Sequence, residues 1–164
     1  MAFFDKLKKS GGAGEYTSVF APAAGTLVPM KLIQDDVFSE GILGECCGIE
    51  AERGEIFSPI DGNITQVSET RHAVGIEGGG VEVLIHVGID TVDMNGDGFE
   101  VNVEAGGKVR SGDLIIKADL DKIKKAGHPT TVVTVITNSS DFSGVDVTQK
   151  TKLDVGDELF KIRK

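Results

Sequence analysis

The chain has 164 residues, which is enough for one domain with a sizeable buried core. Its formal net charge is −9, from 26 acidic and 17 basic residues. Such a surface argues against a nucleic-acid partner; it would attract a basic protein partner, and the alternative is that the charge serves only solubility. The sequence also contains no apolar run of the roughly 20 residues that cross a bilayer.

The two cysteines, Cys46 and Cys47, are adjacent in the sequence, a spacing that is unfavourable for a disulfide. No C-x-x-C spacing suited to zinc or redox chemistry is present. There is also no secretory h-region at the N-terminus. These features favour a reducing compartment and predict a cytoplasmic protein.

Residues 1–18 are predicted to form a flexible segment ahead of a domain over residues 19–164. Within residues 1–9, two phenylalanines and a leucine at helical spacing are flanked by three lysines. This pattern is typical of an amphipathic helix that touches anionic lipid, and its short length predicts weak contact. The alternative is a frayed tail that leads into the glycine-rich linker at residues 10–14.

Beyond this segment, short Val- and Ile-rich runs alternate with glycine-rich turns, which indicates an all-β protein. We expect short helices at residues 37–38 and 120–126, the second ended by Gly127 and Pro129. Strands are predicted over residues 18–20, 25–29, 48–50, 54–57, 62–67, 73–77, 81–87, 99–103, 114–117, 131–137 and 158–162.

Two pairs of segments resemble each other. Residues 21–27 and 58–64 both have the order small, Pro, two residues, Gly, one residue, aliphatic. Residues 109–115 and 155–159 each place a Gly-Asp turn before an apolar strand. Repeated turns of this kind predict a duplicated β motif in an antiparallel sandwich or barrel.

The segment around residues 71–87 contains two of the three histidines. Three glycines at residues 78–80 separate two strand-like runs, which predicts a hairpin. If the hairpin is centred on Gly79, His72 lies directly opposite His86, with Cβ atoms roughly 5 Å apart. A shift of one residue in register would break this pairing.

The side-chain pattern of residues 81–87 assigns the two faces of this strand. The apolar residues Val81, Val83, Ile85 and Val87 share one face and are predicted to point into the core. His86 lies on the other face with Glu82 and Leu84, so both imidazoles are expected near the surface. Val74 is expected on that same outward face, and Ala73 and Gly75 are expected to pack opposite Ile85 and Val83.

Two imidazoles this close together do not both carry a charge, so at least one is expected to be neutral near pH 7. A neutral ring nitrogen is a nucleophile and also a metal ligand. We expect the carbonyl of Gly88 to accept the other ring N–H of His86 and Thr70 to orient His72. The alternative is two strand histidines with no shared role.

Residues 80–92 (GVEVLIHVGIDTV) resemble the phosphohistidine signature of the glucose-class enzyme IIA family of the bacterial sugar phosphotransferase system. That signature reads Gly, two variable residues, three apolar residues, His, apolar, Gly, apolar, variable, Thr, Val, and every position fits. The runs ETRHA at residues 69–73, NGDGF at 95–99 and VRSGD at 109–113 are also similar to family motifs. The resemblance extends from about Val19 to the C-terminus and implies the family's all-β duplicated hybrid motif.

The resemblance implies a phosphocarrier mechanism. His86 would accept a phosphoryl group on Nε2 from the phosphohistidine of HPr and pass it to a cysteine in the IIB domain of a membrane sugar permease. His72 would be the partner imidazole, needed mainly for onward transfer. Thr70 would position His72, Gly88 would position His86, and the charge of Asp90 would discourage retention of the phosphoryl group.

The resemblance also bears on partners and cofactors. It implies a monomer that needs no bound cofactor, with an apolar rim of Phe38, Val74 and Leu84 that seats partner proteins. Family members also act as regulatory binding proteins. In such complexes, zinc would be shared between His72, His86 and a carboxylate of the partner.

Two further classes share parts of these patterns. Residues 86–90 mimic the H-x-G-x-D motif of lysostaphin-type zinc endopeptidases, but the later H-x-H is absent. A carrier of lipoyl or biotinyl groups would need a lysine at a hairpin tip, for which Lys31 after Met30 is the candidate, and it would leave the histidines unexplained. His128, next to Pro129, is interpreted as a solvent-facing loop histidine.

Overall fold

The computed structural model describes residues 16–164, and the predicted amphipathic helix at residues 1–9 lies outside them. The described residues confirm the all-β expectation, since every strand pair is antiparallel and the helices are short. The largest sheet has eight strands in the order β13 (Lys152–Leu153), β2 (Gly25–Val28), β3 (Glu45–Ala51), β11 (Thr131–Ile136), β7 (Val81–Val87), β6 (Ala73–Gly78), β5 (Gly62–Val67) and β9 (Lys108–Val109).

Two three-stranded sheets complete the fold. They pack with the large sheet around one main apolar core, to which strands of all three sheets contribute. One of the small sheets has the order β1 (Tyr16–Phe20), β14 (Glu158–Arg163), β12 (Gly144–Val147), and the other has the order β4 (Glu55–Phe57), β10 (Leu114–Ala118), β8 (Phe99–Val101).

The predicted duplication is visible in the hydrogen bonds around the two proline-containing turns. Phe20 N donates to Pro59 O at 2.9 Å, and Phe57 N donates to Pro22 O at 2.8 Å. The strands after these turns, β2 and β5, occupy equivalent places, because each pairs with one long strand and one two-residue strand. The two halves of the fold therefore hold each other through reciprocal backbone contacts.

The Gly-Asp turns repeat this equivalence. The turn at residues 156–157 exchanges two backbone hydrogen bonds with Ala21, at 2.7 and 3.1 Å. The turn at residues 112–113 makes the same two hydrogen bonds with Ser58, at 2.8 and 2.9 Å. Each turn leads into the middle strand of a small sheet, so the repeats noted in the sequence correspond to one β motif used twice.

The predicted strands correspond to observed ones, with differences at their ends. β1 begins at Tyr16, and β3 begins at Glu45 rather than at residue 48. Three observed strands, β9, β12 and β13, were not predicted. Two of these have only two residues, which is too short for a periodic pattern in the sequence.

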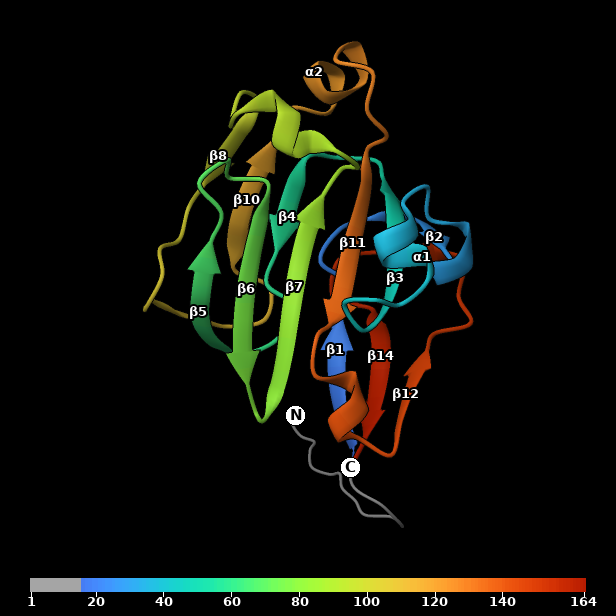
Figure 1. The fold of residues 1–164 in the computed structure, drawn as a ribbon. Helices are drawn as coiled ribbons and strands as arrows, with labels where there is room; N and C mark the ends of the chain where they lie inside the picture. Colours follow the sequence, from blue (N-terminus) through green and yellow to red (C-terminus); the bar gives the residue numbers. More distant parts are fainter. Residues whose placement is uncertain (1–15) are drawn as a thin grey trace.

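A second, smaller apolar cluster lies on the outer face of the large sheet. The segment that contains the 3₁₀ turn η2 (Met30–Leu32) and the helix α1 (Asp36–Ser39) covers β3 and β11 there (Figure 1). The strand β11 has this segment on one face and the main core on the other, so every residue of β11 is buried. We call this second set the outer cluster; its buried members are Ile33, Phe38, Cys46, Ile89, Val133 and Val135.

The β6–β7 hairpin has a register one residue different from the predicted one. Its turn consists of Gly79 and Gly80, whose φ angles of 59° and 82° are those of the two-residue turns that suit twisted hairpins. As a result Ala73, and not His72, lies directly opposite His86. The prediction of direct cross-strand pairing between the two histidines is therefore wrong.

The face assignment of β7 is confirmed, since Val81, Val83, Ile85 and Val87 are buried in the main core. The one-residue shift reverses the prediction for β6. Val74 lies opposite Ile85 and is fully buried in the main core, and it does not lie on the outward face. Ala73 and Gly75 lie opposite His86 and Leu84 on the outer face.

The end of β7 that carries the histidine lies at one end of the molecule. The helix α2 (Leu120–Lys125) lies at the same end, whereas β1 begins and the chain ends at the opposite one (Figure 1). The residues after β7 form the 3₁₀ turn η3 (Thr91–Met94). No helix among the described residues has the length and apolar character needed to span a membrane.

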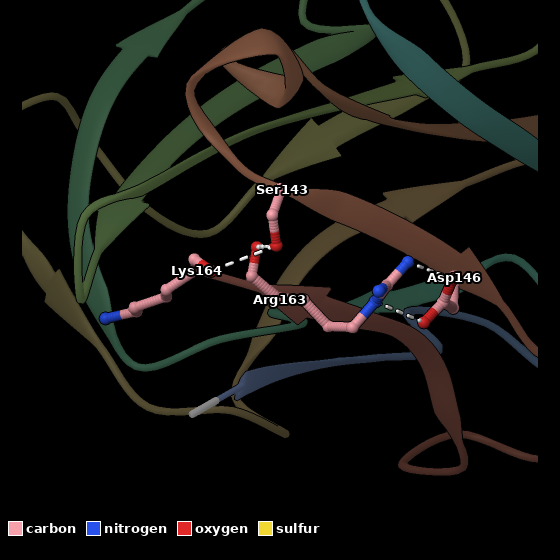
Figure 2. A network of polar contacts seen from close by, with 4 residues as sticks. All are labelled: Ser143, Asp146, Arg163 and Lys164. Carbon is pink, nitrogen blue, oxygen red and sulfur yellow. Dashed lines mark hydrogen bonds and ion pairs between the residues drawn. The ribbon is translucent and has the colours of Figure 1, made fainter. Parts of the chain in front are cut away.

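The C-terminal strand is fixed to β12 near the end of the chain (Figure 2). Arg163 donates from Nε to an oxygen of Asp146 at 2.9 Å, and the Ser143 hydroxyl donates to the carbonyls of Arg163 and Lys164 at 3.1 and 2.9 Å. Ser143 follows the 3₁₀ turn η4 (Ser139–Asp141). These contacts are exposed, so we expect them to align the strand with little effect on stability.

We predict that Gly62→Ala strongly destabilises the fold. A Cβ at this position would lie 2.2 Å from the carbonyl oxygen of Glu77, so the backbone of two paired strands must move apart. The expected loss in free energy of unfolding is about 2–3 kcal/mol, measured by urea denaturation. Gly107→Ala is the control, because its nearest neighbour would be 3.1 Å away; equal losses in the two variants would contradict this account.

Candidate active site

His86 is held by a hydrogen bond that fixes the position of its proton. Its Nδ1 lies 2.8 Å from the carbonyl oxygen of Gly88. A carbonyl only accepts, so Nδ1 carries the hydrogen and the lone pair of the neutral ring is on Nε2. Gly88 has a φ of 79°, and a Cβ there would lie 2.4 Å from Thr91 Cγ2, which accounts for a glycine at this position.

His72 lies in the turn between β5 and β6, and its side chain is 7% exposed. The hydroxyl of Thr70 lies 2.6 Å from Nδ1, as the sequence predicted for an orienting residue. The backbone carbonyl of His72 also accepts from Val87 N at 2.8 Å. This backbone contact continues the hairpin by one residue and brings His72 beside β7.

The two imidazoles are in contact although they are not a cross-strand pair. Their ring centroids are 4.7 Å apart, with the planes at 83°. Phe38 of α1 packs edge-on against His86 at 5.0 Å, and Phe99 of β8 lies 6.4 Å from His72. No described residue hydrogen-bonds to Nε2 of either histidine, so both nitrogens are available to a reacting group.

Both histidines are neutral at pH 7. Burial, followed by the proximity of His72, lowers the pKa of His86 to about 4, against the opposing effects of the Gly88 carbonyl and the Asp35 carboxylate. Burial also lowers the pKa of His72. The site therefore presents an uncharged, desolvated imidazole, which is the nucleophilic form.

Asp35 and Asp90 differ in their relation to His86. Asp35 caps α1 by accepting from Val37 N at 2.8 Å, and its charge acts on the pKa of His86. Asp35 was not among the site residues predicted from the sequence, although its place before a short helix is typical of an N-cap. Asp90 adopts a left-handed conformation, with a φ of 59°, at the start of η3, and its side chain is exposed.

The surface around the site differs from the predicted rim. Phe38 is only 4% exposed and packs on His86, Leu84 is half-buried, and Val74 belongs to the main core. Other apolar side chains are exposed in the segments that flank the histidines. We call these the docking rim; they are Val37, Ile42 and Leu43 beside Phe38, and Val92 in η3.

The remaining candidate residues lie apart from the pair. His128 N donates to Ile123 O at 3.1 Å at the end of α2, and this histidine is half-buried rather than fully solvent-facing. Lys31 lies within η2 and not at a hairpin tip, where a lipoyl or biotinyl lysine would be needed. Over residues 16–164, no group of three or more His, Cys, Asp or Glu side chains could hold a metal ion.

The fold and the paired neutral imidazoles are those of a protein that transfers groups through histidine. A family model described as the phosphoenolpyruvate-dependent sugar phosphotransferase system, EIIA 1, matches residues 17–142. The chain belongs to this EIIA family. It is therefore an EIIA component of a sugar phosphotransferase system, the family that the sequence resembles.

Relatives of known function agree with this assignment. The chain is 37% identical over 158 residues to a β-glucoside-specific EIIBCA component of Halalkalibacterium halodurans, covering 96% of this chain and 25% of the relative. It is 36% identical over 162 residues to the β-glucoside-specific EIIBCA component of Dickeya chrysanthemi. This match covers 98% of this chain and 26% of the relative. The chain thus spans about a quarter of the length of these relatives.

A solved structure confirms the fold. The glucose permease IIA of Mycoplasma capricolum superposes with a TM-score of 0.80 at 27% sequence identity. The match covers 98% of this chain and 99% of that one. The antiparallel hybrid architecture is therefore shared over the whole described domain.

We predict that His86 makes the protein less stable in acid. The ordinary histidine pKa is 6.5 and that of folded His86 is about 4, so between these values only the unfolded chain takes up this proton. Stability is therefore lost as the pH falls from 6.5 towards 4, by about 2 kcal/mol at pH 5. Urea denaturation at pH 7.5 and 5.0 should show a smaller loss for His86→Gln than for the wild type; equal losses would contradict the assignment.

Proposed function

We propose that His86 accepts a phosphoryl group on Nε2 from the phosphohistidine of HPr and passes it to a cysteine of a permease IIB domain. The observation that carries this proposal is the hydrogen bond from Nδ1 to Gly88 O, which leaves the lone pair on Nε2. In the first step a P–Nε2 bond forms as the P–N bond of the donor breaks. In the second, the thiolate of the acceptor forms a P–S bond and the His86 bond breaks.

His72 is proposed as the residue that stabilises charge on the phosphoryl group. When the Thr70 hydroxyl donates to Nδ1 across 2.6 Å, the proton of the neutral ring is on Nε2. That N–H then donates to an oxygen of a phosphoryl group in transit between His86 and a partner. Positioning and charge stabilisation supply most of the catalysis in phosphoryl transfer, and the pair offers both.

The carboxylates of Asp90 and Asp35 are proposed to limit the lifetime of the phosphorylated state. Asp35 already acts on the charge of His86, and Asp90 lies exposed four residues further along the chain. A phosphoryl group carries up to two negative charges, so nearby carboxylates raise its free energy. The group would then pass readily to an acceptor.

The docking rim and the charge of the protein suit the proposed partners. The docking rim offers exposed apolar side chains in the segment of α1, whose Phe38 contacts His86, and in η3, which follows β7. The net charge of −9 attracts a basic partner surface. We therefore propose HPr and a IIB domain as successive occupants of this rim, with the protein acting as a monomer in the cytoplasm and touching the membrane weakly through residues 1–9.

We propose that the sugar is selected by the permease rather than by this chain. The relatives named above are β-glucoside-specific, whereas the solved structure belongs to a glucose permease IIA. Similar EIIA folds thus occur with different sugars.

Zinc binding is proposed only for a complex with a regulatory partner. The ring centroids of His72 and His86 are 4.7 Å apart, and no described residue hydrogen-bonds to either Nε2. Nε2 of His72 would ligate zinc in the tautomer that carries its proton on Nδ1 and donates it to the Thr70 hydroxyl. A tetrahedral zinc site needs further ligands, and a carboxylate of a partner would provide one of them. The protein alone is therefore expected to bind zinc weakly.

We predict a single acid-labile phosphoryl adduct on His86. Phosphoenolpyruvate, enzyme I and HPr are incubated with the wild type, His86→Ala and His72→Gln, and the intact mass of each is recorded. The adduct should be absent only from His86→Ala, whereas His72→Gln should be phosphorylated but fail to pass the group to a IIB domain. An unmodified wild type in the presence of phosphorylated HPr would overturn the proposal.

We predict that Ile42→Asp weakens docking without unfolding the protein. Ile42 is 65% exposed, so the change costs little stability, but a charge at the apolar rim should raise the KM for phospho-HPr about tenfold. Val147→Asp on β12, in a different sheet and 36% exposed, is the matched control. Equal KM values for both variants and the wild type would show that the rim is not the docking surface.

A further inference from the structure

The two adjacent cysteines lie on opposite faces of β3. Cys46 and Cys47 are each 1% exposed, but Cys47 belongs to the main core and Cys46 to the outer cluster. On the outer face Cys46 lies opposite Val135 of β11, and the neighbouring pair on β11 and β7 is Val133 with His86. Only Cys46 therefore shares the face of the sheet that carries the active histidine.

The thiol of Cys46 contacts the helix that covers this face. Its Sγ donates to the carbonyl oxygen of Phe38 at 3.3 Å, and this hydrogen bond is buried. The helix α1 has only four residues, and a single turn is not stable on its own. Asp35 caps the start of α1. At its other end the Phe38 carbonyl accepts from Gly41 N at 3.0 Å and from the thiol, and of these two donors only the thiol belongs to the sheet.

Phe38 in turn contacts the reactive imidazole. Its ring centroid lies 5.0 Å from that of His86, with the planes at 64°. Phe38 is itself 4% exposed, so its ring excludes water from one side of the imidazole. A shift of the α1 backbone would therefore expose His86 without breaking its hydrogen bond to Gly88.

We propose that Cys46 is a positioning residue for phosphoryl transfer: its thiol anchors the Phe38 carbonyl, which seats the phenyl ring against His86 and keeps the imidazole desolvated and oriented. The expected effect on the rate of phosphoryl transfer rests on the proposed role of His86, whereas the expected effect on the solvation and orientation of its imidazole does not. Cys46 acts as a hydrogen-bond donor and not as a nucleophile. Burial raises its pKa to about 12, so the thiol keeps its proton.

The test compares Cys46→Ala, Cys46→Ser and Cys46→Val with the wild type. Serine retains a donor, alanine removes it, and valine fills the space without donating, which keeps the test informative if alanine fails to fold. Cys47→Ala is the matched control, since it removes an equally buried thiol from the other face of the same strand. The first measurement is the titration of the His86 ring protons by NMR, and the second is the rate of phosphoryl transfer from phospho-HPr at saturation.

We expect Cys46→Ala and Cys46→Val to move the titration midpoint of His86 upward, towards the ordinary histidine value. His72 and Asp35 are the titratable neighbours that act on His86, and neither is altered in these variants. The maximal rate should fall about fivefold, the loss expected for one hydrogen bond. Cys46→Ser should restore both quantities in large part, and Cys47→Ala should change neither.

Two outcomes would overturn the proposal. An unchanged His86 titration in both donor-free variants would show that the thiol does not seat Phe38. An equal shift in Cys47→Ala would show general loosening of the fold instead of a specific contact. If the wild type accepts no phosphoryl group at all, the proposed function is overturned, and the titration still decides whether Cys46 positions the imidazole.

Discussion

The hydrogen bond between His86 Nδ1 and the Gly88 carbonyl, 2.8 Å long, is the contact on which the chemistry of the site depends. It selects one tautomer of a neutral ring and directs the lone pair of Nε2 away from the backbone. It requires a left-handed residue two positions after the histidine, with no Cβ to strike Thr91. Burial then keeps this ring uncharged at physiological pH, so Nε2 needs no general base to be nucleophilic in the proposed reaction.

The scaffold supplies that burial through its central strand. β11 is covered by the main core on one side and by the outer cluster on the other, and β7 lies directly beside it. The duplicated β motif closes the main core, while the segment of α1 covers the outer face only in part. His86 thus lies at the boundary of the outer cluster, where Phe38 covers one side of its ring and the side chain is only partly buried.

The sequence predicted most of the fold and the identity of the histidine pair, because β7 alternates strictly and its turn residues are glycines. The hairpin register could not be predicted, because the run of three glycines is compatible with a two-residue or a three-residue turn. The two turns place His72 and Val74 differently relative to β7. The local contact of Thr70 with His72 was expected from the sequence, whereas the contact of Phe38 with His86 comes from tertiary packing. No periodicity in the chain encodes such contacts.

In the proposed mechanism the phosphoryl group is carried on Nε2 of His86 while Nδ1 remains bound to the backbone. The most direct measurement is ¹⁵N-resolved NMR of the ring nitrogens in the phosphorylated protein. We expect phosphorus coupling to Nε2 of His86 and a protonated Nδ1, with His72 unmodified. A phosphoryl group on Nδ1 of His86, or on His72, would contradict it.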